Sequence, residues 1–112
     1  MDRTEIVICT YRVKAGQETA FEKLLERHWP TLRELALVTT DPPQHFRGFE
    51  QSGEPLFVEI FTWASREASA KAHEHPEVMA IWEPMDILTE TRAGRPNMEF
   101  PHVQPLALTL AA

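Results

Sequence analysis

Residues 55–88 read PLFVEIFTWASREASAKAHEHPEVMAIWEPMDIL, and this stretch decides the fold. Residues 56–64 are almost all apolar and rich in β-branched and aromatic side chains, which predicts a strand with both faces at least partly covered. After a short turn, residues 66–74 and 77–88 carry apolar positions at helical spacing, with Pro76 suited to the first turn of the second helix. The stretch therefore predicts a buried strand followed by helices that must pack on a sheet.

The residues before this stretch supply two more strands and a helix. Residues 4–13 are apolar on both faces, which predicts an interior strand. Residues 17–35 carry an apolar stripe at helical spacing, and Pro30 either kinks that helix or begins a second one. Residues 44–51 alternate as an edge strand, and the turn that follows makes them a hairpin with residues 56–63.

Residues 97–103 alternate again, and Pro101 and Pro105 indicate an irregular edge strand. The resulting order predicts an α+β, ferredoxin-like βαββαβ domain over residues 1–112, with a four-stranded antiparallel sheet and both helices on one face. The other face is also apolar, and a second copy of the chain would cover it. We therefore expect a homodimer through the open sheet face, forming a dimeric α/β barrel. The apolar tail, LALTLAA, is also expected to dock on a surface.

Composition excludes several classes of function. The 112 residues carry a net charge of −6 without a basic stripe, so nucleic-acid binding is not expected. One cysteine excludes an internal disulfide framework, and no segment is long enough for a signal peptide or a membrane span. We therefore expect a cytoplasmic protein that makes no membrane contact. The four glycines form no phosphate-binding loop, and there is no CxxC or nucleophile elbow.

Two residues of the central stretch are candidates for catalysis. Glu59 lies within an apolar strand, so its carboxylate must be paired, hydrogen-bonded or raised in pKa. Arg12 or Arg47 is the expected partner, and the group is either a structural ion pair or a catalytic base. His73 is either a base or ligand contact in a pocket, or a bridge between helix and sheet edge. His75 diverges from His73 on a helix, so we expect no metal site.

Aromatic residues provide a candidate ligand pocket. Tyr11, Phe61, Trp63 and Trp82 would either line a pocket for a flat ligand or pack as core. His28 lies in the apolar stripe of the first helix and is a further pocket candidate. Other side chains receive plainer interpretations: His45 and His102 as exposed or interfacial residues, and Cys9 as an inert core thiol.

The central residues resemble a known family. Residues 59–65 (EIFTWAS), Ala72-His73, His75-Pro76 and Val78 are similar to the antibiotic-biosynthesis-monooxygenase-like members of the dimeric α/β-barrel superfamily. Residues 11–16 (YRVKAG), followed by an acidic helix with Phe21, are similar to the opening of that family. The resemblance implies a homodimer with one pocket per subunit, between sheet and helices.

The resemblance implies two chemistries, and the chain departs from both. Some members oxidise phenolic polyketides or quinols without a cofactor, using a first-strand Asn and a Trp, but here Cys9 or Thr10 falls at the Asn position. Others bind and degrade haem through a Trp on a helix and a His later in the chain. Here His73 falls at the position of that Trp, and Glu83 or a neighbour falls at the position of that His.

Three possible functions therefore remain. The first is a cofactor-independent monooxygenase of an aromatic or phenolic compound, with Tyr11, Glu59, Trp63 and His73 in binding or proton transfer. The alternative is a non-catalytic dimer that binds a small ligand or serves a structural role. Haem binding is the third possibility, and no cofactor is expected.

Overall fold

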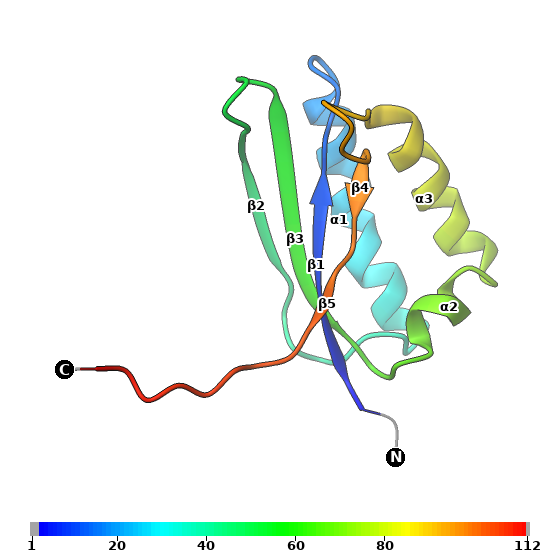
Figure 1. The fold of residues 1–112 in the computed structure, drawn as a ribbon. Coiled ribbons are helices and arrows are strands. Elements are labelled where there is room, and N and C mark those ends of the chain that lie inside the picture. Colours follow the sequence, from blue (N-terminus) through cyan, green and yellow to red (C-terminus); the bar gives the residue numbers. More distant parts are fainter. Residues whose placement is uncertain (1–2, 112) are drawn as a thin grey trace.

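The computed structural model describes residues 3–111, which form one antiparallel sheet with all helices on one of its faces (Figure 1). This arrangement confirms the predicted ferredoxin-like fold. The elements in chain order are β1 (Glu5–Tyr11), α1 (Glu18–Glu34), β2 (Gln44–Phe49), β3 (Pro55–Trp63), α2 (Ala68–Ala72), α3 (Pro76–Leu88), β4 (Met98–Glu99) and β5 (His102–Val103).

The sheet has the strand order β2-β3-β1-β4, and β5 pairs with β1 as well. The predicted fourth strand is thus present as two short pieces along one edge of β1. Between them the backbone N–H of Ile8 donates to the carbonyl of Pro101 at 3.0 Å. Proline has no N–H to return, so the ladder is interrupted at this position. The hairpin of β2 and β3 is confirmed, with Phe49 opposite Pro55.

The helices largely follow the predicted pattern. α1 is one continuous helix with Pro30 inside it, so Pro30 does not begin a second helix. The helix expected over residues 66–74 is shorter, spanning only the five residues of α2. Pro76 stands at the start of α3, where its missing N–H leaves no helical bond unmade.

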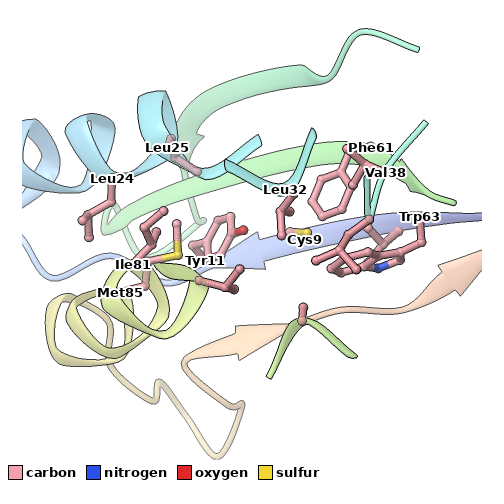
Figure 2. Close-up of a cluster of buried hydrophobic side chains, with 14 of the residues drawn as sticks. Cys9, Tyr11, Leu24, Leu25, Leu32, Val38, Phe61, Trp63, Ile81 and Met85 are labelled. Carbon is pink, nitrogen blue, oxygen red and sulfur yellow. The ribbon is translucent and has the colours of Figure 1, made fainter. Parts of the chain in front are cut away.

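The core lies between the sheet and the helices. Alternate residues of β1 and β3 are buried against this layer, because successive strand side chains point to opposite faces. Figure 2 shows this cluster, where side chains of β1 and β3 meet those of α1 and α3. Its strand and helix members include Val7, Cys9, Tyr11, Phe21, Leu24, Leu25, Leu32, Phe57, Phe61, Trp63, Val78, Ile81 and Met85.

The opposite sheet face has no helix over it and is apolar. Ile8 of β1 lies opposite Ile60 of β3, and both are only partly buried. On β2, Phe46 lies opposite Val58 and is 54% exposed. We refer to this surface as the open face.

The last described residues run away from the body as an extended segment (Figure 1). Leu106, Leu108 and Leu110 are all strongly exposed there, so the expected docking surface for this tail is not provided by the rest of its own chain. Over residues 3–111 no helix is both long and apolar enough to cross a membrane.

Candidate functional site

A cavity of about 880 Å³ lies between the sheet and the helices α2 and α3. Its sheet wall includes buried apolar side chains, among them Cys9 of β1 and Phe61 and Trp63 of β3. Polar groups reach the cavity at few points, one of which is His28 of α1. An apolar hollow with few polar groups is typical of small-molecule sites.

Behind this wall, Glu59 of β3 is fully buried and accepts three hydrogen bonds. Tyr11 donates its hydroxyl to Oε1 at 2.9 Å, and Nδ1 of His28 lies 2.8 Å from the same oxygen. Nε2 of His45 lies 2.8 Å from Oε2. These donors come from β1, α1 and β2, so the carboxylate connects three elements around one buried charge.

The tautomer of His28 follows from its second neighbour. Trp82 of α3 lies with its indole Nε1 2.8 Å from Nε2 of His28. An indole N–H can only donate, so Nε2 of His28 accepts and carries no proton. The remaining ring proton is on Nδ1, where it is donated to Glu59. His28 is therefore a neutral imidazole, oriented by a carboxylate on one side and capped by Trp82 on the other.

The network holds Glu59 as an anion. Burial alone would raise the pKa of this carboxyl, but its polar partners, His28 first and then His45 and Tyr11, outweigh burial and lower the pKa to about 2. In return, the hydrogen bond to Glu59 raises the pKa of His45 against a smaller opposing effect of burial.

Two other groups near Glu59 remain protonated. Burial, followed by the charge of Glu59, raises the pKa of Tyr11 well above its usual value, so its phenol acts as a neutral donor. The same two causes raise the pKa of Cys9, which lies in the cavity wall. A thiol held in this form is a poor nucleophile, consistent with the expectation of an inert core cysteine.

The structure brings most of the predicted pocket residues together. His28, Phe61, Trp63, His73 and Trp82 all line the cavity. His73 is exposed, and its ring lies edge-on to that of Trp82 with centroids 4.8 Å apart. It therefore borders the cavity next to the Trp82 cap and is not a member of the Glu59 network. Tyr11 is not a lining residue, because it is buried in the core behind the wall.

The predicted partners of Glu59 were wrong. Arg12 is buried, but its guanidinium pairs with Glu99 at 2.7 Å and with Glu50 at 3.4 Å. Arg47 instead pairs with Glu22 of α1 at 3.1 Å.

His45 is exposed, as expected, but its ring is also bonded to a buried carboxylate, which was not foreseen. The signal for this pairing is in the hairpin register, which places His45 directly opposite Glu59. Directly opposed residues point to the same face of a sheet, so the side chain of His45 reaches Glu59 on the helix side.

The described residues contain no cluster of three or more histidine, cysteine or acidic side chains arranged to hold a metal ion. The side chains that line the cavity are instead suited to a neutral organic ligand. Apolar surface and aromatic rings surround the space, and imidazole nitrogen is the basic group at its wall.

Comparison with known proteins gives a fold. The sequence matches no protein-family model and no curated protein sequence. A mutant of SnoaB, a cofactor-independent oxygenase from Streptomyces nogalater, is 13% identical, with 94% of this chain and 95% of that chain covered and a TM-score of 0.66. A dimeric ferredoxin-like protein of unknown function from Jannaschia sp. CCS1 is 13% identical, with 92% and 100% covered and a TM-score of 0.68. The chain has the fold of the dimeric ferredoxin-like proteins.

A candidate antibiotic biosynthesis monooxygenase from Nitrosomonas europaea matches to a similar extent, at 13% identity, 95% and 93% coverage and a TM-score of 0.66. At the level of fold, these matches confirm the resemblance to antibiotic-biosynthesis-monooxygenase-like proteins. The fold is shared both by an oxygenase and by a protein of unknown function, so activity must be argued from the cavity itself.

Proposed function

We propose that the cavity binds a flat, uncharged phenolic compound and that His28 removes its phenolic proton, which begins a cofactor-independent oxygenation. The observation that carries this proposal is the neutral imidazole of His28 at the cavity wall, held in one tautomer by the buried Glu59. A carboxylate behind an imidazole fixes the ring and stabilises the imidazolium that forms when the ring takes a proton.

The charges around the cavity favour a neutral ligand. None of the residues that line it is a lysine or arginine, whereas Glu83 and Asp86 of α3 both line it. An anionic ligand would meet these carboxylates with no fixed cation to offset them. We further propose that His73, next to Trp82, makes a hydrogen bond to the ligand where the cavity opens.

The chemistry that follows deprotonation can proceed without a metal or an organic cofactor. When the indole of Trp82 moves off Nε2 of His28, the phenol gives its proton to this nitrogen, and the resulting anion is easier for dioxygen to oxidise than the neutral phenol. For an anthrone, the methylene carbon becomes a carbonyl, one oxygen atom of O₂ enters the product and the other leaves as water. The described oxygenase activity of a protein with this fold supports the proposal.

Oxygen uptake with a panel of anthrones and quinols tests this function. We expect turnover by the wild-type protein and its loss in His28→Ala, because that variant lacks the base. His73→Ala should weaken substrate binding and leave the maximal rate largely unchanged. If no compound of the panel is consumed, or if His28→Ala retains the wild-type rate, the assigned chemistry is wrong.

One contact favours the alternative of a binding protein without turnover. Trp82 already occupies the lone pair of His28 Nε2. If the indole stays in place when a ligand binds, the base is blocked and the cavity only holds the compound. Ligand binding followed by tryptophan fluorescence, with no oxygen consumed, would establish this second function.

We also propose that a second copy of the chain covers the open face. Phe46, Val58 and Ile60 lie on that face with no helix over them, and an apolar area of this kind is typical of an association surface. The description of a structural relative as dimeric supports this assignment. Sedimentation at micromolar concentration tests it, since a single well-folded monomer would contradict a dimer through this face.

A further inference from the structure

Two histidines share the single carboxylate of Glu59. The register of β2 and β3 places His45 opposite Glu59, and its Nε2 lies 2.8 Å from Oε2. Nδ1 of His28 lies 2.8 Å from Oε1. Each oxygen of the carboxylate therefore faces one imidazole, and the two rings interact through one negative charge.

The two imidazoles open onto different spaces. His28 is buried and lines the main cavity. His45 lines a second hollow of about 460 Å³ between α1 and β2, and its side chain is 39% exposed. Glu59 thus stands between a ring that lines the main cavity and a ring that is partly exposed to solvent.

We propose that His45 is the charge-balancing partner of His28: a proton that arrives on His28 from the cavity drives His45 to release its own proton to solvent. The inference rests on the proposed function for the origin of the incoming proton. One carboxylate neutralises one imidazolium, so two protonated rings would leave a net positive charge around a fully buried group.

The exchange balances in atoms and charge. In the proposed exchange, His45 begins as an imidazolium bonded to Glu59, Glu59 is an anion and His28 is neutral. The phenol then gives its proton to Nε2 of His28, and His45 gives a proton from its exposed ring to water. The network again holds one cation and one anion: the ligand's proton rests on His28, and a different proton, from His45, has been released to solvent.

Other charged groups lie near the two rings. Glu22 and Glu26 of α1 line the hollow beside His45, and Arg47 of β2 is paired there with Glu22. None of these groups is bonded to Glu59, so none of them takes part in the shared carboxylate.

On the cavity side, Glu83 and Asp86 of α3 line the same space as His28, and exposed His73 borders it. Tyr11 shares Oε1 of Glu59 but remains a neutral phenol. Among the groups bonded directly to Glu59, the two imidazoles are therefore the ones that can both accept and release a proton in this exchange.

Nuclear magnetic resonance of protein with ¹⁵N-labelled histidine rings tests this coupling without ligand or oxygen. We expect His28 in His45→Gln to gain its proton at a pH about one unit higher than in the wild type, a tenfold change, because the competing charge is gone. His45→Lys keeps a positive charge beside Glu59 and should leave His28 close to its wild-type behaviour. His75→Gln is the control, since His75 contacts Glu77 and not Glu59.

A role for His45 that is only structural would move the titration of His28 similarly in the Gln and Lys variants. That outcome, or an unchanged titration of His28 in His45→Gln, overturns the proposal. The result is independent of catalysis: loss of oxygen uptake on every substrate would refute the proposed function, while the coupling of the two rings would still be measured.

Discussion

Replacing Glu59 by Gln removes the one negative charge on which Tyr11, His28 and His45 converge. In the folded protein the pKa of this carboxyl is lowered from 4.5 to about 2. At 1.36 kcal/mol for each pKa unit, this difference corresponds to about 3 kcal/mol of stability near neutral pH. We expect Glu59→Gln to lose about this amount at pH 7, measured as the free energy of unfolding in urea.

The pH dependence gives a sharper test than the loss itself. The folded pKa is the lower one, so the stabilisation is complete above pH 4.5 and disappears as the pH falls through about 2. The wild type should therefore lose more stability than Glu59→Gln between pH 5 and pH 2, and the two should converge at the acidic end. Glu77→Gln is a matched control, because that carboxylate is half-exposed and lies 3.8 Å from Nδ1 of His75.

Equal stability of Glu59→Gln and the wild type at pH 7, or parallel loss of stability with falling pH, would refute this reasoning. If Glu59→Gln does not fold, Tyr11→Phe provides a milder change at the same carboxylate. It removes one hydrogen bond to a charged group and should cost about 2 kcal/mol at pH 7, since the donor is buried and the ring is retained.

Three further changes test other parts of the structure. Trp82→Phe removes the indole N–H that caps Nε2 of His28. Oxygen uptake should rise if His28 acts as the base, and it should stay absent if the cavity only binds a ligand. In either case, an unchanged ligand affinity would exclude a role of the indole cap in ligand binding. Arg92→Ala should cost about 3 kcal/mol in urea unfolding, because the guanidinium donates to the carbonyls of Pro55 and Val13 while pairing with three glutamates, and a loss below 1 kcal/mol would contradict this. Phe46→Asp on the open face should shift sedimentation from dimer to monomer without unfolding the chain, and an unaltered dimer would place the interface elsewhere.

The order of elements could be predicted from the sequence because local patterns determine it. The apolar run of β3, the helical stripe of α1 and the turn before Pro55 are each readable within a short window. The break at Pro101 was also foreseeable as irregularity, since proline offers no N–H. What the pattern did not determine was the length of α2, where no strong cap or stripe defines the ends.

The site was only partly predictable, because its contacts join residues that are distant in the chain. Glu59 was identifiable as a charge in an apolar strand, yet its partners depend on how α1 and β2 are placed around β3. Arginine was the expected partner on charge alone. Packing instead directs Arg12 to Glu50 and Glu99, while His28 reaches Glu59 from the buried stripe of α1.

The turn between β2 and β3 acts on the cavity from a distance. It is closed by hydrogen bonds between the backbones of Glu50 and Glu54 and of Gly53 and Glu50, and Gly53 has a φ of +91° that favours glycine. A strand repeats every two residues, so inserting or deleting one residue here would rotate His45 to the open face and turn Phe46 toward the carboxylate. The length of this loop therefore determines which side chain of β2 faces Glu59. Lengthening the loop by one residue would replace the partly exposed His45 by Phe46 and so separate Glu59 from solvent, without altering any residue that touches the ligand.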